Sequence, residues 1–249
     1  MAFVLAAIGG FLFGHLLDLV FVRFYTDEDP SAPLYHCPAC RSPFKARFAV
    51  PLAGYVMSRG RCPDCRAALP LRSVILPMGS AALFATSVAV FDDVLPAVAG
   101  GIFASIFLTL TLTDLERRLL PNRIVYPSIV LAIALSWVWP DASTGEILAG
   151  GAAGVTLGVA LFALSLLFGP GAFGMGDVKM IALIGFVVGP ASLLVGIFLG
   201  TLLAGLMAAT LIFARLKSRK DFIPHGPFLA IGAVIALFWG PEIWDIYRS

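Results

Sequence analysis

Long apolar runs dominate the chain, and short polar or glycine- and proline-containing turns separate them. A run of about 20 apolar residues is long enough to cross the hydrocarbon core of a bilayer as a helix. The pattern predicts eight transmembrane helices, of which the sixth is the shortest because Gly189 and Pro190 follow it directly. The eight runs cover residues 3–25, 73–91, 94–113, 123–139, 146–168, 178–189, 191–214 and 226–244.

The composition agrees with a protein that lies in a lipid bilayer. Hydrophobic residues make up 59% of the 249-residue chain and charged residues 13%, which is about half the charged share of a typical soluble domain. The net charge is only +2, and no long basic tract with interleaved aromatic residues is visible. Nucleic acid is therefore not an expected partner. The first run has no basic stretch before it and no small-residue cleavage site, so we expect it to remain as an anchor.

Lys and Arg gather in the turns that eight spans place on one side of the membrane. These turns hold 16 of the 17 basic residues, whereas the opposite turns are acidic or neutral, with Asp92, Asp93 and residues 141–146. Cytoplasmic loops of membrane proteins carry an excess of Lys and Arg. The pattern predicts that both termini face outward and that the long polar segment after the first helix is cytoplasmic.

Two polar boundaries divide the chain into three parts. Residues 1–25 form a first transmembrane helix, residues 26–72 a polar insert, and residues 73–249 a seven-helix membrane domain. The predicted fold is therefore an all-α polytopic membrane protein with a small insert between its first and second helices.

All four cysteines lie in this insert as two Cys-x-x-Cys pairs. Cys37 and Cys40 form the first pair, and Cys62 and Cys65 form the second. Four thiolates with this spacing suit a tetrahedral structural Zn²⁺ site. Two disulfides are the alternative, which a reducing cytoplasm disfavours. Because the insert is too small for a sizeable core, we expect the metal to supply much of its stability.

Two carboxylates lie where apolar runs meet the predicted cytoplasmic face. Asp114 ends the third helix, and Asp177 lies at the start of the sixth. An ionisable residue near membrane depth is costly and indicates a functional site. Two carboxylates close together cannot both ionise at low cost, so one can act as a base while the other donates a proton. The alternatives are a helix cap for Asp177 and a helix end paired with nearby arginines for Asp114.

The neighbours of Asp177 are candidates for substrate contact. Gly174 and Gly176 lack side chains, which permits a close approach of another backbone. The side chain of Lys179 is long enough to pair with a carboxylate or to reach lipid headgroups, and we favour the headgroups. His225 lies in a proline-flanked turn before the last helix and is interpreted as a polar residue at headgroup level.

The order of these motifs resembles that of the type IV prepilin leader peptidases, which are membrane aspartic proteases of the Gly-x-Gly-Asp kind. The likeness covers nearly the whole chain and includes the two Cys-Pro-x-Cys pairs and residues 112–122, 174–179 and 226–229. It implies that Asp114 and Asp177 form the catalytic pair. It also implies a bacterial inner-membrane enzyme that removes the short basic leader of type IV prepilins or pseudopilins on the cytoplasmic side.

Fuller members of that family also methylate the new N-terminus, with S-adenosylmethionine as the cofactor and with the cytoplasmic insert involved. Residues 14–18 of this chain read Gly-His-Leu-Leu-Asp where the family usually has Gly-Ser-Phe-Leu-Asn, and residues 72–77 lack the family's glutamate. His225 replaces a common phenylalanine. These departures leave the aspartate pair intact but call methyl transfer, and with it S-adenosylmethionine, into question.

Two functions of other classes stay open at this point. A proton- or cation-coupled transporter would use Asp114 and Asp177 as a relay, although many transporters have repeated halves and no repeat is visible in this sequence. A membrane scaffold would use the insert to bind a partner. A scaffold would keep its activity when both aspartates are replaced.

Overall fold

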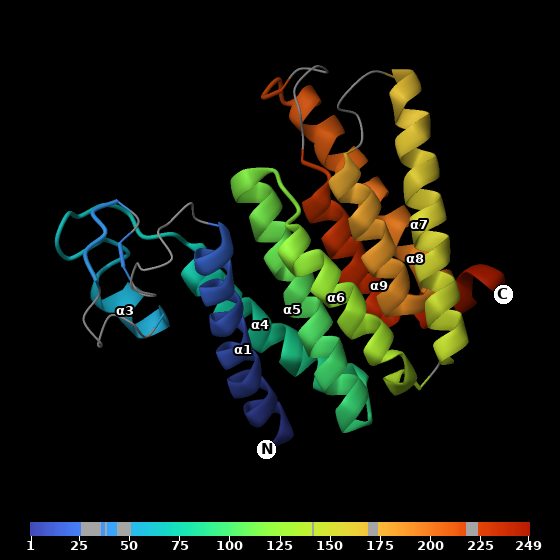
Figure 1. Cartoon of the computed structure of the whole chain (residues 1–249), viewed down its shortest axis with the longest axis horizontal. Helices are drawn as coiled ribbons and strands as arrows, with labels where there is room; N and C mark the ends of the chain where they lie inside the picture. The colour runs from blue at the N-terminus through green and yellow to red at the C-terminus, as the bar shows by residue number, and fades with distance from the viewer. Residues whose placement is uncertain (26–35, 38, 44–50, 141, 169–173, 218–223) are drawn as a thin grey trace. The chain divides into compact units, whose positions relative to one another are not determined.

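The computed structural model describes residues 1–25, 36–37, 39–43, 51–140, 142–168, 174–217 and 224–249 (Figure 1). Six helices in these ranges are long and apolar enough to cross a membrane. They are α1 (Ala2–Tyr25), α4 (Arg72–Val90), α5 (Val94–Arg117), α7 (Thr144–Ser165), α8 (Met175–Phe213) and α9 (Gly226–Arg248). The shorter elements are α3 (Pro51–Met57), α6 (Asn122–Ala134), η1 (Ser136–Val138) and η2 (Leu166–Phe168). The predicted all-α polytopic fold is confirmed.

The eight expected segments are helical, but the structure divides them differently. α6 has 13 residues, so it is only about 20 Å long. The expected sixth and seventh helices are joined in α8, whose 39 residues would span about 58 Å if straight, roughly twice a bilayer core. Gly189 interrupts α8 with φ 75° and ψ 178°, a conformation that suits glycine. The chain changes direction there, so the two parts of α8 face different neighbours (Figure 1).

The chain forms two compact units, an N-terminal unit (Met1–Ala89) and a C-terminal unit (Val90–Ser249). In the N-terminal unit, α1 packs against α4 through glycines. A Cβ atom added at Gly10 or Gly14 would collide with backbone atoms of α4, including the carbonyl oxygens of Ser80 and Leu76. Small residues of this kind let helices approach closely in membranes.

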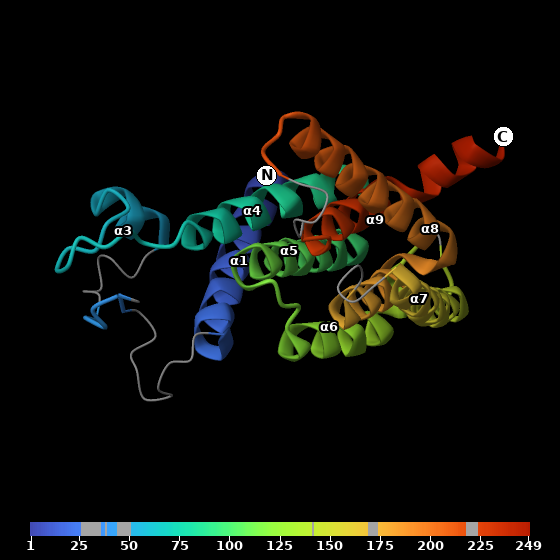
Figure 2. The ribbon, with the colours of Figure 1, turned by 90° about the horizontal axis from the view of Figure 1, so that it is seen from above.

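In the C-terminal unit, α8 packs against α7 and α9, and α9 is enclosed by α5 and α8 (Figure 2). Gly150 of α7 meets Gly185 in the first part of α8, and Gly196 in the second part meets Gly232 of α9. The backbones touch at these crossings, which explains why the sequence has glycine there. Fully buried side chains of this unit include Phe103, Phe107, Leu110, Met180, Ile184 and Leu229.

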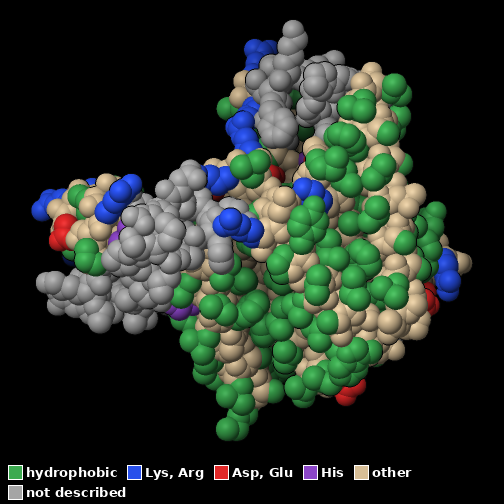
Figure 3. Space-filling view, viewed as in Figure 1, with side chains coloured by type: hydrophobic (Ala, Val, Ile, Leu, Met, Phe, Trp, Pro, Cys, Tyr) green, Lys and Arg blue, Asp and Glu red, His purple; other side chains and the backbone are tan. Residues whose placement is uncertain are grey.

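The surface of the C-terminal unit separates apolar from charged side chains. Hydrophobic side chains cover most of the helical face seen in Figure 3. Lys and Arg lie where α5 ends and where α8 begins and ends, at Arg117, Lys179 and Arg215. Asp93 precedes α5, and Glu146 lies in the first turn of α7 at the other end of the bundle. The charge separation that the sequence predicted is therefore also a separation between two ends of the folded unit.

Candidate active site and metal centre

Asp114 lies in the last turn of α5, where the helix leaves the core of the C-terminal unit. Only 9% of Asp114 is exposed, whereas 56% of the adjacent Leu115 is exposed. α5 ends at Arg118, which takes a left-handed conformation (φ 54°) and donates its N–H to the carbonyl oxygen of Asp114 at 2.8 Å. The charges of Arg118 and the Asp114 carboxylate also interact. The sequence left open that Asp114 is a helix-end charge paired with nearby arginines. The interaction with Arg118 agrees with that interpretation, but it is only one part of the environment of Asp114.

Asp177 is the third residue of α8 and not its N-cap. The helix begins at Met175, and Gly174 is the N-cap residue. Oδ2 of Asp177 accepts a hydrogen bond from the backbone N–H of Gly174 at 3.0 Å. The alternative that Asp177 is the N-cap residue of a helix starting at Val178 is therefore wrong, because the helix starts three residues earlier. The Asp177 carboxylate nevertheless accepts a hydrogen bond from a backbone N–H at the helix start. The positive end of the helix dipole favours an anion at this position.

The two carboxylates are 63 positions apart in the sequence, but the fold brings them close enough to influence each other. Their charges interact across the gap between α5 and α8. Packing supports this, because a Cβ at Gly176 would lie 3.2 Å from Cδ1 of Leu120, just after α5. The segment that carries Asp177 is thus seated against the segment that follows Asp114.

The start of α9 closes the site from a third side. The backbone of Gly226 forms a hydrogen bond with the Asp114 carboxylate. A Cβ at Gly226 would lie 2.6 Å from Oδ2 of Asp114, which is closer than real Cβ contacts come. A residue with a side chain therefore cannot occupy position 226 without moving the carboxylate. This close approach explains the glycine.

His225 is a member of the site that sequence reasoning missed. It is half-buried, and its charge interacts with that of Asp177. Burial lowers the pKa of the His225 imidazole, while the Asp177 carboxylate acts in the opposite direction. Two features of the sequence could have placed His225 in the site: it precedes Gly226, and it replaces an aromatic residue that is common in the family. The interpretation of His225 as a polar residue at headgroup level used neither feature.

Lys179 binds α6 and does not simply extend towards headgroups. Its Nζ donates to Oδ1 of Asn122 at 2.8 Å and lies 5.6 Å from the ring centroid of Tyr126. Gly174 is exposed, and Gly176 is half-buried. Of the three expected substrate contacts, only Gly174 is exposed, and its N–H and carbonyl oxygen both form hydrogen bonds within the first turn of α8. Gly176 and Lys179 attach α8 to neighbouring segments.

The four cysteines form a separate cluster in the N-terminal unit. One sulfur from each of Cys37, Cys40, Cys62 and Cys65 lies within 4.8 Å of the others. The distance from Cys37 Sγ to Cys65 Sγ is 3.6 Å, and that from Cys40 Sγ to Cys62 Sγ is 3.8 Å. Four Zn–S bonds of about 2.3 Å in a tetrahedron place sulfurs about 3.8 Å apart. The cysteines are free, and these distances far exceed the roughly 2.05 Å of a disulfide.

The two Cys-x-x-Cys turns have the same local structure. The N–H of Cys37 donates to the carbonyl oxygen of Ser42 at 3.0 Å, and the N–H of Cys62 donates to that of Ala67 at 2.8 Å. Arg41 (φ 57°) and Arg66 (φ 59°) occupy equivalent left-handed positions in the two turns. Each turn directs two sulfurs to the same point, so the donor set and its geometry fit a metal ion such as Zn²⁺.

Comparison with known proteins adds to this geometry. Residues 101–209 match the type IV leader peptidase family, and residues 8–91 match the bacterial peptidase A24 N-terminal domain. The chain is 33% identical to a prepilin leader peptidase/N-methyltransferase of Aeromonas hydrophila, over 90% of this chain and 78% of that protein. It is 27% identical to a protein of the same description in Bacillus subtilis, over 87% and 86% of the two chains.

A third relative, from Escherichia coli, is described as a type 4 prepilin-like proteins leader peptide-processing enzyme. It is 29% identical, over 94% of this chain and 93% of its own length. No solved structure matches the chain.

Proposed function

This chain belongs to the type IV leader peptidase family and is a membrane prepilin peptidase, and we propose that Asp114 and Asp177 are its catalytic carboxylates. The relatives do not support the alternative of a proton- or cation-coupled transporter. The observation that carries the proposal is the meeting of the end of α5, the start of α8 and the start of α9 around these two side chains.

The mechanism follows from two carboxylates that share one proton. The ionised carboxylate takes a proton from a water molecule, whose oxygen attacks the carbonyl carbon of the scissile peptide bond. The protonated carboxyl group gives its proton to the carbonyl oxygen. When the C–N bond breaks, one carboxyl group gives its proton to the leaving amine and the other carboxylate takes a proton from a hydroxyl group of the tetrahedral intermediate, so the pair returns to its starting charge.

The backbone of Gly226 and the imidazole of His225 hold this pair in place in the proposed mechanism. Gly226 fixes the Asp114 carboxylate by a hydrogen bond, and His225 adds a titratable neighbour to Asp177. We assign Gly174 to the substrate, because it is exposed, has no side chain and is hydrogen-bonded to Asp177. Gly176 and Lys179 act indirectly by holding α8 against Leu120 and Asn122.

The substrates are type IV prepilin or pseudopilin precursors, whose leader lies on the cytoplasmic side of a bacterial inner membrane. The concentration of Lys and Arg at the bundle end that holds Asp114 and Asp177 supports this orientation. A leader cut at that end leaves the following hydrophobic segment in the bilayer.

We further propose that Cys37, Cys40, Cys62 and Cys65 bind one structural Zn²⁺ ion. The sulfur spacing supports this assignment. Metal analysis of the purified protein should find about one equivalent of zinc, and replacement of Cys37 and Cys62 by serine should remove it. Zinc content that does not change in this variant would refute the assignment.

Methyl transfer is the second proposed activity, with S-adenosylmethionine as its cofactor. Two of the relatives are described as N-methyltransferases as well as peptidases. The positions that depart from the family pattern contain a carboxylate, Asp18, which is paired with Arg72. The departures therefore do not leave this region without an acid, so we retain the activity for testing.

One experiment tests both activities. The purified full-length protein is incubated with a prepilin precursor in lipid, with and without S-adenosylmethionine, and the product masses are measured. We expect loss of the leader in both samples and the addition of a methyl group only with the cofactor. An intact precursor would contradict peptidase activity, and an unmodified new N-terminus would contradict methyl transfer alone.

A further inference from the structure

An exposed segment of mixed character, residues 56–61, lies at the end of α3 in the insert. α3 ends with Val56 and Met57, which are 65% and 60% exposed. Arg59 and Arg61 come soon after them and are also exposed. Apolar and cationic side chains on one short segment are typical of chains that lie at a membrane surface. The peptidase mechanism makes no use of this segment.

A backbone hydrogen bond holds this segment close to the start of α4. The carbonyl oxygen of Gly60 accepts from the N–H of Leu69 at 2.9 Å. α4, which is long and apolar enough to cross a membrane, begins at Arg72. The three residues from Leu69 to Arg72 span no more than about 11 Å. The segment therefore lies beside the point where the chain enters the bilayer.

Arg59 occupies a backbone position that normally suits glycine. Its φ is 53°, and its N–H donates to the carbonyl oxygen of Val56 at 3.1 Å. The N–H of Gly60 donates to the carbonyl oxygen of Tyr55 at 2.8 Å, which completes the end of α3. Helices often end on a glycine in this left-handed conformation, because a Cβ atom makes the conformation costly. An arginine at this position therefore indicates a use for its charge.

Arg59 and Arg61 have no ion-pair partner among the residues that the structure describes. The acid nearest to them in the sequence is Asp64, whose carboxylate accepts a hydrogen bond from the hydroxyl group of Ser42. Both guanidinium groups are therefore available to an anion outside the protein.

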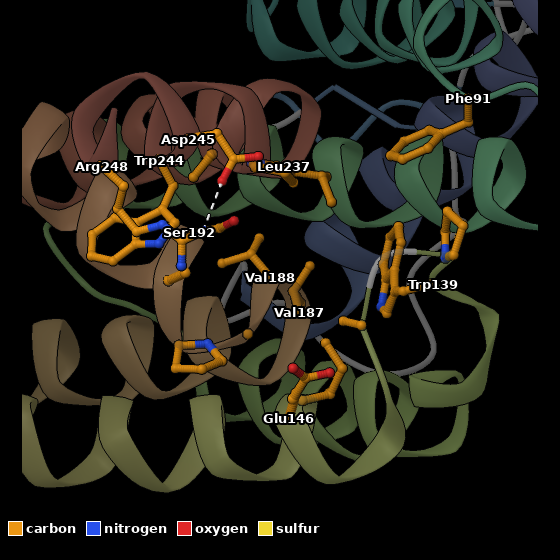
Figure 4. Close-up of a pocket in the computed structure, with 18 residues that line it drawn as sticks. Phe91, Trp139, Glu146, Val187, Val188, Ser192, Leu237, Trp244, Asp245 and Arg248 are labelled. Atoms are coloured by element: carbon orange, nitrogen blue, oxygen red, sulfur yellow. Dashed lines mark ion pairs between the residues drawn. The ribbon is translucent and has the colours of Figure 1, made fainter.

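The charged side chains around a cavity of the C-terminal unit differ in this respect. The cavity has a volume of about 410 Å³ and lies between the start of α7, the interruption of α8 and the end of α9 (Figure 4). Asp245 pairs with Arg248 at 3.6 Å. Glu146 accepts a hydrogen bond from the N–H of Ser143 at 2.7 Å. Groups with partners in the protein have less to gain from an external ion than the arginines of residues 56–61.

We propose that residues 56–61 dock on anionic phospholipid headgroups of the bilayer that α4 enters. Arg59 and Arg61 pair with lipid phosphates, and Val56 and Met57 enter the layer below the headgroups. Because the segment is anchored beside α4, it meets the lipid surface at a high effective concentration. A soluble anion would pair with the guanidinium groups but would leave the two apolar side chains in water. The proposal does not depend on the peptidase assignment or on bound zinc.

Fluorescence quenching by labelled lipids tests the proposal. A fluorescent amino acid replaces Met57 in the full-length protein, which is reconstituted in nanodiscs of phosphatidylcholine with increasing fractions of phosphatidylglycerol and a trace of lipid that carries a nitroxide on its headgroup. We expect quenching to rise with the phosphatidylglycerol fraction and to fall when salt is added, because salt screens exposed charges. Quenching that does not depend on phosphatidylglycerol would overturn the proposal. Protection of position 57 from aqueous iodide without headgroup quenching would also overturn it, because protein would then cover the segment.

Variants at position 59 separate docking from folding. Arg59→Gly suits the left-handed backbone, so the thermal midpoint of unfolding should not fall. Loss of one charge should nevertheless lower the ratio of docked to undocked protein about fivefold at a given phosphatidylglycerol fraction. Arg59→Lys keeps the charge and should keep the ratio, and Arg248→Gln, which removes an exposed arginine of the C-terminal unit, is the matched control. An unchanged ratio in Arg59→Gly would contradict the pairing with lipid.

Discussion

Two buried carboxylate environments in this molecule show opposite designs. Asp18 in the N-terminal unit is 5% exposed and pairs with Nε of Arg72 at 3.3 Å, while Arg72 lies 4.3 Å above the ring of Phe21. Asp114 in the C-terminal unit is 9% exposed and faces a second carboxylate, that of Asp177. A buried acid next to a cation is neutralised and holds two helices together. A buried acid next to another acid is poised to exchange a proton, so the partner distinguishes the two roles and burial does not.

Removal of either active-site acid should have the largest effect on activity. Asp114→Asn and Asp177→Asn keep the side-chain shape but cannot exchange a proton, so we expect each to lower the initial rate of precursor cleavage by at least about 10³-fold. Asp18→Asn should change that rate by much less, because its role is structural. Near-normal cleavage by Asp114→Asn or Asp177→Asn would show that these acids, like Asp18, have no direct part in catalysis.

The contact of Gly226 with Asp114 is the next most sensitive feature. Gly226→Ala places a methyl group where the carboxylate lies, so cleavage should fall by about 10²-fold, as for a displaced catalytic group. Gly205→Ala is the matched control, since a Cβ at Gly205 meets no atom within 4 Å. Equal rates for the two alanine variants would show that position 226 does not position the acid.

The Asp18–Arg72 pair should affect stability more than cleavage. Asp18→Asn leaves the Arg72 guanidinium buried without its counterion, and breaking a buried pair in this way costs about 3 kcal/mol. The thermal midpoint of unfolding should fall. Replacement of both residues, by Leu at 18 and Met at 72, should recover most of the loss, because no buried charge then remains. If the double variant is no more stable than Asp18→Asn, apolar packing cannot replace the ion pair, and the pair does more than hold α1 against α4.

His225 should produce the smallest change. Burial lowers the pKa of this imidazole, so it is largely neutral at neutral pH and gains charge only as the pH falls. A charged His225 would favour the ionised form of its neighbour Asp177. In His225→Phe, the acidic limb of the cleavage-rate profile should therefore move to higher pH, by less than about one unit. A profile that coincides with that of the unchanged protein would place His225 outside the site.

Much of this fold could be predicted from local sequence patterns, and the remaining features depend on contacts between residues far apart in the sequence. The apolar runs predicted the helices, and the Cys-x-x-Cys spacing predicted the sulfur cluster, because both depend on residues close together in the chain. The break at Gly189 and Pro190 was predicted for the same reason, and the structure confirms it as the non-helical residue Gly189 that separates the two parts of α8. His225 was missed because its neighbour Asp177 lies on another helix, and no local pattern reports that contact.

The central claim is that α5 and α8 bring positions 114 and 177 into one site. Cysteines placed at both positions, with the four native cysteines changed to serine, should cross-link with a short bifunctional thiol reagent. Cysteines at positions 93 and 177 should not, because Asp93 lies at the far end of α5, roughly 32 Å from Asp114. Failure of the 114–177 pair to cross-link, when each single cysteine still reacts with the reagent, would contradict the account.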